Sequence, residues 1–501
     1  MYRRNNIIVF SFISLLLDLF SFSEIPANFA LISNIGQDST ACLRKPFSTA
    51  CCTINYILSN AQMHSITGVY IKGQEDGIPT KCAHAESDFI WDLRFPLTAI
   101  MGYPFSMIVK SLCSITFKGG DNIEYLKAIE IRNLHFINGS LQFKNSLSII
   151  FTNVSFVETI ISDLKGERKY SKVQQYLNVT FHFCHFSFFN HSNNSIQFSN
   201  SYNMKLLVTN SSFENVEIYI ATYNFNVRFK NVKIAIKQSQ KFLSVNNPVP
   251  VQGSKEYQIR VSRKLQFWYT TTMTTLHDKA YFLLVQTINI FIMLANCKVA
   301  DIYTGLSFQP FYTKSVFDGI RFSLLIKNTS FIHKSASKRN RGIEIIIPKH
   351  NSILVRSKIE FDNCTFVRHF AEYGSVMYIK VESYISFYGN PMTLTVKNCY
   401  FSDNYCIKMG CCLYIGKHIE TYISGSTFSF SSHTSSLSQL TGLFLTSFSI
   451  FSIKSTKFLF TSSVTFTSVS LISIQTMSKQ FQFNRHTKNI NKVEHICPMW
   501  H

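Results

Sequence analysis

The amino-acid sequence predicts an all-β solenoid, and three observations support this prediction. A six-residue pattern recurs along most of the chain, the copies are regularly spaced, and the segments between them are rich in β-branched and aromatic residues. Its six positions hold, in order, an apolar residue, any residue, a residue that is usually Asn, any two residues and a second apolar residue. Its eleven copies are IRNLHF (Ile131 to Phe136), FTNVSF (Phe151 to Phe156), FHFCHF (Phe181 to Phe186), VTNSSF (Val208 to Phe213), FKNVKI (Phe229 to Ile234), LANCKV (Leu294 to Val299), IKNTSF (Ile326 to Phe331), FDNCTF (Phe361 to Phe366), VKNCYF (Val396 to Phe401), ISGSTF (Ile423 to Phe428) and IKSTKF (Ile453 to Phe458).

The central residue of each copy is expected to act as a hinge. In Leu394 to Phe401, Leu394 and Val396 point to one side of a strand because side chains alternate with a period of two. Asn398 tolerates the left-handed conformation, so it bends the strand without ending it. Cys399 and Phe401 then point to the same side as Leu394 and Val396. Each copy therefore forms an L-shaped wall with one apolar inner surface.

Eight hinges are Asn, and the other three are Phe183, Gly425 and Ser455. Successive hinges are 20 to 35 residues apart, except for one gap of 65 residues in which we expect one or two degenerate rungs and a long loop. These features fit a parallel β-helix, in which each turn of the chain adds one rung to several parallel sheets. Rungs stack roughly 4.8 Å apart, so hinge amides can hydrogen-bond along the stack. We expect such a ladder from Asn133, Asn153, Asn210, Asn231, Asn296, Asn328, Asn363 and Asn398.

The repeats carry a resemblance to known proteins. Phe361 to Lys380 (FDNCTFVRHFAEYGSVMYIK) and Val396 to Gly416 (VKNCYFSDNYCIKMGCCLYIG) are similar to the repeats of polymorphic outer-membrane proteins and of large extracellular animal proteins. The chain thus resembles the right-handed parallel β-helix proteins of the pectate-lyase-like superfamily, over residues 125 to 460 and at the level of the repeat. The resemblance implies a right-handed, single-stranded parallel β-helix and does not imply an activity.

We predict four segments. Residues 1–23 form a signal peptide, because Arg3 and Arg4 precede an apolar run from Ile7 to Leu17 that is too short to span a bilayer. Residues 24–124 form a Cys-rich cap and the first rungs, residues 125–475 the β-helix, and residues 476–501 a basic tail. A small capping helix is expected around Ile54 to Ala61, where apolar residues fall on one helical face. We expect an exported protein with no transmembrane span in this chain.

The chain has 13 Cys, and export permits disulfides. The cap contributes one group of candidates and the turn after the hinge at Asn398 contributes another, but spacing does not settle the connectivity. The candidates are Cys42, Cys51, Cys52, Cys82, Cys113, Cys406, Cys411 and Cys412. Cys364 and Cys399 follow hinges on successive rungs, within reach of a disulfide, but we expect them to be stacked buried thiols.

Acidic residues are scarce, and this bears on catalysis. Enzymes on this scaffold need carboxylates on outward positions of consecutive rungs, but the chain has only 28 Asp and Glu, and Asp362 is nearly the only one expected outward on a hinge strand. We therefore predict that the protein is not an enzyme and needs no metal or cofactor. A lyase or hydrolase acting on acidic polysaccharide is the alternative, and two carboxylates within ~10 Å on one sheet face would favour it. A third reading is an N-terminal fragment of a larger adhesion or receptor protein.

The formal net charge of +21 is the remaining functional clue. Basic residues gather in three expected loops, Leu164 to Lys172, Lys255 to Lys264 and His333 to Gly342, which would form a positive strip if they stacked on one side. The alternative is that loops are charged because they are solvated. From the strip we expect a partner such as an acidic polysaccharide or a cell-surface protein, and no nucleic acid. The anion-binding candidates are Lys165, Arg168, Lys169, Lys338, Arg339 and Arg341.

Eight N-glycosylation sequons are present. Four lie at hinges, and we expect these to stay bare because an amide bonded into the ladder does not easily carry a sugar. The four expected to be glycosylated are Asn138, Asn178, Asn190 and Asn193.

Overall fold

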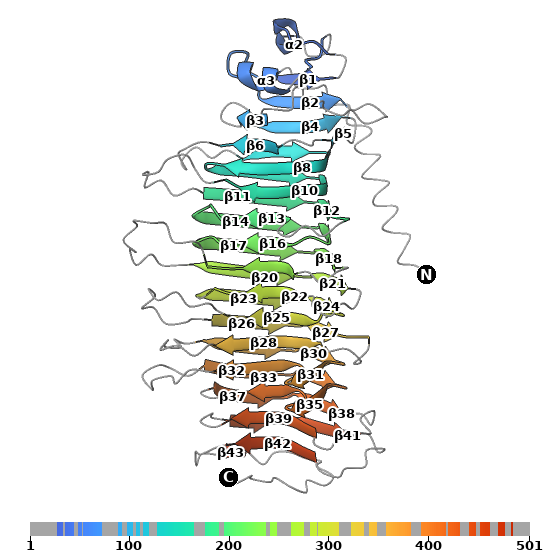
Figure 1. Cartoon of the computed structure of the whole chain (residues 1–501), viewed down its shortest axis with the longest axis vertical. Helices are drawn as coiled ribbons and strands as arrows, with labels where there is room; N and C mark the ends of the chain where they lie inside the picture. Colours follow the sequence, from blue (N-terminus) through green and yellow to red (C-terminus); the bar gives the residue numbers. More distant parts are fainter. Residues whose placement is uncertain are drawn as a thin grey trace, which may run out of the picture.

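The chain coils into an elongated stack of parallel strands (Figure 1). The structure is a computed structural model that describes residues 28–33, 36–44, 49–52, 54–72, 89–92, 98–103, 107–110, 114–119, 128–164, 176–189, 195–236, 241–247, 262–274, 281–287, 289–309, 322–334, 340–347, 357–381, 392–416, 419–430, 440–446, 451–460, 469–475 and 482–483. The predicted parallel β-helix is confirmed, because strands pair in parallel with strands one turn earlier and one turn later.

One long sheet, here called sheet A, contains the strand that leads into each hinge. Its strands follow one another in chain order along the stack. They are β1 (Phe29–Ile32), β2 (Gly68–Lys72), β4 (Ala99–Tyr103), β7 (Ile129–Arg132), β9 (Leu147–Thr152), β11 (Tyr176–His182), β14 (Asn203–Thr209), β17 (Asn224–Lys230), β20 (Arg263–Trp268), β23 (Ile290–Ala295), β26 (Phe322–Lys327), β29 (Lys358–Asp362), β33 (Met392–Lys397), β37 (Ile419–Ser424), β40 (Phe451–Lys454) and β43 (Gln482–Phe483).

The strands that follow the hinges form a second row, here called the middle strands. β8 and β10 continue past a second corner, so each of them also contributes to a third row. The middle strands are β5 (Met107–Lys110), β8 (Leu134–Lys144), β10 (Ser155–Asp163), β12 (His185–Ser187), β15 (Ser212–Glu214), β18 (Lys233–Ile236), β21 (Thr271–Thr274), β24 (Lys298–Ala300), β27 (Ser330–Ile332), β30 (Thr365–Val367), β34 (Tyr400–Ser402), β38 (Thr427–Phe430) and β41 (Lys457–Phe460).

The third row, here called the far strands, returns the chain toward sheet A. Two further strands, β31 (Phe370–Tyr373) and β35 (Tyr405–Met409), pair with each other as a separate small sheet. The far strands are β3 (Phe89–Asp92), β6 (Ser114–Lys118), β13 (Ile196–Phe198), β16 (Ile218–Ile220), β19 (Lys241–Val245), β22 (Tyr281–Val285), β25 (Thr304–Phe308), β28 (Arg341–Ile347), β32 (Met377–Val381), β36 (Leu413–Ile415), β39 (Leu440–Thr446) and β42 (Val469–Gln475).

The hinge residues adopt the left-handed conformation. The eight hinge Asn have φ between 47° and 56°, and Phe183, Gly425 and Ser455 have φ of 53°, 60° and 49°. The 65-residue gap contains one more rung, whose hinge is Tyr269 with φ of 51°. The six-residue pattern misses this rung because its hinge is not Asn and Thr272 stands at the position where the other copies have an apolar residue.

A second corner, between the middle and the far strands, is also built on left-handed residues. Its positive φ values belong to Asn138, Glu158, Asn215, Asp301, Arg368 and Asp403. These residues share no single side-chain type, so the sequence does not mark this corner as clearly as the first.

The interior is a continuous apolar core of stacked side chains. Phe156, Phe186 and Phe213 occupy one inward position on successive rungs, with ring centroids 4.7 and 4.5 Å apart. Ile, Leu and Val fill the inward positions of sheet A in the same way. This burial is the main source of stability, since each rung contributes its apolar side chains to the next.

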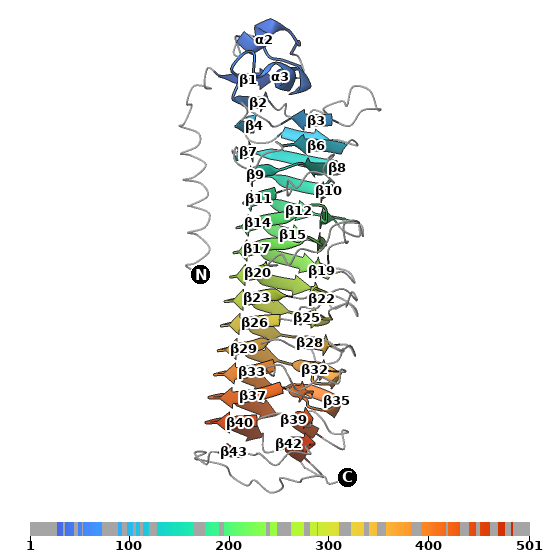
Figure 2. The same ribbon diagram turned by 90° about the vertical axis from the view of Figure 1, so that its left-hand side faces the viewer.

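Two short helices lie at the N-terminal end of the stack (Figure 2). They are α2 (Thr40–Arg44) and α3 (Ile54–Asn60), and the disulfide between Cys42 and Cys51 holds the segment around α2. Ile57 and Ala61 are buried, as the predicted capping helix requires. Within the described residues, no helix is long and apolar enough to cross a membrane. The predicted signal peptide lies outside the described residues.

Candidate functional site: a basic corner along the hinges

The outward positions on either side of the hinges form a file of cationic side chains along the stack. One position directly precedes the hinge, at the end of the sheet A strand, and the other begins the middle strand. The register of the strands aligns each position from rung to rung. We call the following seven residues the basic corner: Lys230, Lys233, Lys298, Lys327, Lys397, Lys454 and Lys457.

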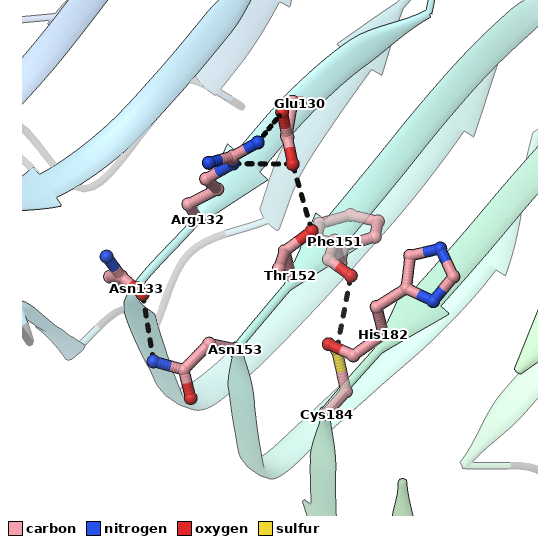
Figure 3. Close-up of polar contacts among 8 residues, drawn as sticks. All are labelled: Glu130, Arg132, Asn133, Phe151, Thr152, Asn153, His182 and Cys184. Atoms are coloured by element: carbon pink, nitrogen blue, oxygen red, sulfur yellow. Dashed lines mark hydrogen bonds and ion pairs between the residues drawn. The ribbon is translucent and has the colours of Figure 1, made fainter. Parts of the chain in front are cut away.

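Hydrogen bonds between hinge amides hold parts of this corner (Figure 3). Asn153 donates through Nδ2 to Oδ1 of Asn133 at 2.8 Å, and Asn231 donates to Asn210 at 2.6 Å. Asn363 donates to Asn328 in the same direction at 2.9 Å. Each donor therefore lies one rung after its acceptor, so the ladder has a direction. Phe183 and Tyr269 interrupt it, because neither side chain has an amide. Among the described residues, the predicted members Asn296 and Asn398 have no such bond to the hinge on the neighbouring rung.

The residue after most hinges is Ser, Thr or Cys, and it secures the bend from inside, whereas Leu134, Val154 and Val232 follow the other hinges. Ser211 donates through Oγ to the carbonyl of Thr209 at 2.8 Å and accepts the amide hydrogen of Cys184 at 3.0 Å. The Cys184 thiol lies 3.4 Å from the carbonyl of His182 and 3.5 Å from that of Phe151, one rung earlier. This position therefore accommodates a small side chain that can donate a hydrogen bond. This explains why Ser, Thr and Cys recur after the hinge.

Four post-hinge thiols, including the predicted pair Cys364 and Cys399, are buried and free. Burial raises the pKa of Cys184 to about 12 and that of Cys297 to about 11. A hydrogen bond with Cys364, together with burial, raises the pKa of Cys399. The same hydrogen bond lowers the pKa of Cys364. Cys184, Cys297 and Cys399 remain protonated at neutral pH, so they act as small core residues and do not serve as nucleophiles.

The most highly charged part of the corner lies on β26, β29 and β33. Lys327, Asp362 and Lys397 occupy the same outward position on these three strands. Glu360 also points outward on β29, and its carboxylate forms an ion pair with the ammonium group of Lys358 at 2.7 Å. That bond from Lys358 is the main cause of the lowered pKa of Glu360, and the charges of Lys397 and Lys327 lower it further. Glu360 is therefore ionised at neutral pH.

The sequence-based expectation about outward acids was too narrow. Glu130, Glu360 and Glu420 face outward on sheet A strands in addition to Asp362. Near the first hinges, Glu130 forms an ion pair with Arg132 and accepts a hydrogen bond from Thr152 at 3.0 Å (Figure 3). The alternation of the strand gives these positions, but they lie before the six-residue pattern, which begins two residues before the hinge.

Cations outnumber anions along the corner. Among the described residues, no lysine of the basic corner forms an ion pair, whereas the acids Glu130 and Glu360 already have basic partners. Lysines at the same position are at least two rungs apart, which is roughly 10 Å at 4.8 Å per rung and close to the Debye length of about 8 Å at physiological salt. Their potentials therefore overlap only partly along the stack. The corner is suited to a ligand with repeated negative charges.

The basic loops predicted from the sequence contribute little to what the structure describes. Lys165, Arg168, Lys169, Lys338 and Arg339 lie outside the described residues. Arg341 begins the strand β28, where it is partly buried and paired with Glu344. Arg263, from the second predicted loop, points inward and is 6% exposed. Burial lowers the pKa of Arg263 to about 10, and Thr287 accepts a hydrogen bond from its guanidinium at 2.7 Å.

The cysteine candidates separate into bonded, free and undescribed residues. Cys406 bonds to Cys411, with Cα atoms 4.6 Å apart, and Cys42 bonds to Cys51. Cys412 is buried and free, and Cys52 is exposed and free. Cys82 and Cys113 lie outside the described residues. Within the described part of the chain, there is no group of three or more His, Cys, Asp or Glu that could hold a metal ion.

The glycosylation candidates occupy different environments. Asn138 is exposed at the second corner. Asn178 is half-buried on β11, where its Nδ2 donates to Ser148 Oγ at 3.0 Å and its Oδ1 is buried. That contact disfavours a sugar on Asn178. Asn190 and Asn193 lie outside the described residues.

Comparisons with known proteins add little detail to this picture. No protein-family profile matches the sequence, and no curated protein matches it either. Among solved structures, tailspike protein 3 of bacteriophage CBA120 is similar with 9% identity and a TM-score of 0.25, over 87% of this chain and 61% of the tailspike. The A-module of a mannuronan C-5 epimerase from Azotobacter vinelandii is similar with 10% identity and a TM-score of 0.22, over 83% of this chain and 94% of the module.

The comparisons contradict one of our predictions. We predicted from the scarcity of carboxylates that the protein is not an enzyme, but one of the two similar structures belongs to an epimerase. A low count of acids over the whole chain is a poor criterion because a catalytic site needs only a few residues at one place. The parallel pairing of its strands, rung upon rung, identifies this chain as a parallel β-helix repeat protein.

Proposed function

We propose that this protein is exported and binds acidic polysaccharide lengthwise along the basic corner. The observation that carries the proposal is the file of lysines that lack ion pairs within the described residues and recur at two aligned positions, two or more rungs apart. A linear polyanion carries charges along its whole length, so it can contact several of these lysines together. The signal-like segment at residues 1–23 and the two disulfides support export.

Binding to polygalacturonate, followed by isothermal titration calorimetry at increasing NaCl, tests the proposal. We expect the double variant Lys327→Glu with Lys397→Glu to bind at least tenfold more weakly and to depend less on salt. The matched control pairs Lys205→Glu with Lys264→Glu, two lysines on the outer face of sheet A away from the hinges. This control makes the same change in net charge, so it should weaken binding less than threefold. Equal losses in both variants would show that only net charge matters.

A second candidate function is the modification of an acidic polysaccharide, and one observation favours it. Glu360 and Asp362 lie two residues apart on the same face of β29, which places their backbones ~7 Å apart. This satisfies the spacing that we set for a carbohydrate-active site. Lys327 and Lys397 on the neighbouring rungs would hold an anionic substrate beside these carboxylates.

This candidate is tested by incubating polygalacturonate and polymannuronate with the protein. New reducing ends, absorbance of an unsaturated product, or a changed ratio of uronate epimers would show activity. The variants Glu360→Gln and Asp362→Asn should abolish that activity and leave the binding of polymer intact. A protein that binds but leaves all three product signals unchanged would exclude this candidate for these two polymers.

A further inference from the structure

A cluster of tyrosines lies on a different face of the stack. Tyr378 and Tyr414 occupy the same outward position on the successive far strands β32 and β36, with ring centroids 5.0 Å apart. Tyr373, on the small sheet β31, completes the group, 5.6 Å from Tyr414 and 6.3 Å from Tyr378. Figure 2 shows β28 and β32 on the side of the stack opposite β29 and β33. The cluster is therefore separate from the basic corner.

The rings do not stack face to face as the core rings do. The planes of Tyr378 and Tyr414 are inclined by 34°, and those of Tyr373 and Tyr414 by 70°. In the core, Phe401 and Phe428 are inclined by only 5°. Inclined, half-buried rings leave parts of their faces uncovered by one another. Such surfaces accept the apolar C–H face of a sugar ring.

Two cations lie against the rings, and both are already paired. The Arg341 guanidinium carbon is 4.6 Å from the centroid of Tyr378, and Arg341 also forms an ion pair with Glu344 and donates to the carbonyl of Tyr373 at 3.2 Å. Lys408 is 5.1 Å from the centroid of Tyr373 and pairs with Glu372. Since each of these two cations has an acidic partner, they add little net charge to the cluster. Lys380 is a further cation whose charge acts on Tyr378 and Tyr414.

The polar groups around Arg341 are held in place. Glu344 Oε2 accepts hydrogen bonds from Gln309 Nε2 at 3.0 Å and from Ser307 Oγ at 3.3 Å. Its Oε1 pairs with Arg341, so both oxygens are engaged. By contrast, Arg341 Nε is buried and has no hydrogen-bond acceptor. An unsatisfied buried donor is costly, and a hydroxyl oxygen brought to the rim would satisfy it after a small rotation of the side chain. Burial raises the pKa of Tyr378, so its hydroxyl stays neutral.

We propose that the cluster of Tyr373, Tyr378 and Tyr414 with Arg341 is a binding site for an uncharged pyranose residue of a carbohydrate chain. The sugar ring stacks on the tyrosines, and Arg341 donates to one of its hydroxyl groups. This site is independent of the basic corner, since it lies on another side of the stack and its ligand carries no charge. Binding at the cluster should therefore be insensitive to salt, whereas binding at the corner should weaken as salt increases.

The test uses the full chain and a panel of neutral hexasaccharides built from glucose, mannose, galactose or N-acetylglucosamine. Calorimetry is carried out at 0.1 and 0.5 M NaCl, two concentrations between which charge screening increases strongly. We expect at least one hexasaccharide to bind with an affinity that changes less than twofold between the two salt concentrations. The variant Tyr378→Ala should weaken that binding at least tenfold. Tyr378→Leu should do the same and is used if the alanine variant loses its native circular dichroism.

Tyr202→Ala is the matched control. Tyr202 packs on Tyr223 of another rung with a centroid distance of 5.1 Å. The Tyr202→Ala variant therefore removes a ring of the same kind from a comparable pair. It should change the affinity less than twofold. The proposal is overturned if no hexasaccharide of the panel binds, if binding disappears at 0.5 M NaCl, or if Tyr202→Ala and Tyr378→Leu have equal effects. Failure of polygalacturonate to bind would overturn the proposed function of the basic corner and leave this site unaffected.

Discussion

Asn153 donates a hydrogen bond from its side-chain amide to Oδ1 of Asn133, 2.8 Å away, although the two residues are one full turn of the coil apart. Both residues have the left-handed backbone, with φ of 53° and 56°. One residue type thus serves two purposes, since Asn tolerates this conformation and its amide also bonds along the stack. Changes at a hinge can separate these two contributions.

Replacement of Asn231 is expected to destabilise the stack. Asn231→Ala removes the hydrogen bond to Asn210 and places a Cβ-bearing side chain without local hydrogen bonding in the left-handed region. We expect a loss of about 2–3 kcal/mol in the free energy of unfolding. Asn231→Gly removes only the hydrogen bond and should cost about 1 kcal/mol. Urea unfolding followed by circular dichroism gives both values, and equal losses would mean that backbone strain contributes nothing.

Phe366 should be among the costliest core positions. It is fully buried and stacks between Phe331 and Phe401, with 5.2 Å between centroids on each side. Phe366→Ala should cost about 3–5 kcal/mol, and Phe366→Asp several kcal/mol at least, since it buries an unpaired charge. The control is Phe189→Ala, which truncates a ring that is 73% exposed and should shift stability by less than about 0.5 kcal/mol. Urea midpoints compare the three variants.

Two buried histidines should make stability depend on pH. His333 and His369 pack with ring centroids 4.5 Å apart, and Nδ1 of each is buried without a hydrogen-bond partner. Burial lowers the pKa of His333 to about 4, although the negative charge of Asp301 acts in the opposite direction. Asp301 also forms an ion pair with Lys334. Burial and the neighbouring His333 lower the pKa of His369, whereas a hydrogen bond to the carbonyl of Phe331 acts to raise it.

A lowered folded-state pKa means that the unfolded chain binds more protons between pH 6.5 and 4. Stability should therefore be highest above about pH 6.5 and fall as the pH approaches 4, by about 3 kcal/mol for His333 alone. Urea unfolding at several pH values measures the slope. The double variant His333→Leu with His369→Leu should flatten it, and His185→Gln, which removes an exposed imidazole, is the control. An unchanged slope in the double variant would contradict the assignment.

Thiol labelling should separate the cysteines by burial. In the native protein, iodoacetamide should modify Cys52, which is exposed. Cys184, Cys297, Cys364, Cys399 and Cys412 should react only after denaturation, since they are buried. Peptide mapping by mass spectrometry reads out each site. Native labelling of Cys184 as fast as that of Cys52 would contradict the inward position of the post-hinge residues.

Glycopeptide mapping after expression in a glycosylating host tests the register of the hinges. We expect sugar on Asn138, which is exposed, and little on Asn153 and Asn363, whose amide nitrogens donate to the preceding hinge. Asn178 should also stay bare because its amide nitrogen bonds to Ser148. Sugar found mainly on the hinge residues would contradict this arrangement.

The sequence by itself determined the coil and its inner surface. The alternation of Leu394, Val396, Cys399 and Phe401 about Asn398 is local, because a strand has a period of two and the hinge bend spans a single residue. Local rules of this kind can be read from six residues, and they predicted the parallel β-helix. They did not reveal the Tyr269 rung, where the hinge lacks the amide of the Asn hinges and Thr272 takes the place of the final apolar residue.

Only the tertiary structure decided which side chains become neighbours along the stack. Lys327 and Lys397 flank Asp362, Tyr378 meets Tyr414, and His333 meets His369, although each pair is at least 35 residues apart in the chain. The number of residues that each loop absorbs differs from rung to rung, so spacing in the sequence does not give the vertical alignment. The pairing of backbone hydrogen bonds between rungs fixes that alignment, and with it the basic corner and the tyrosine cluster.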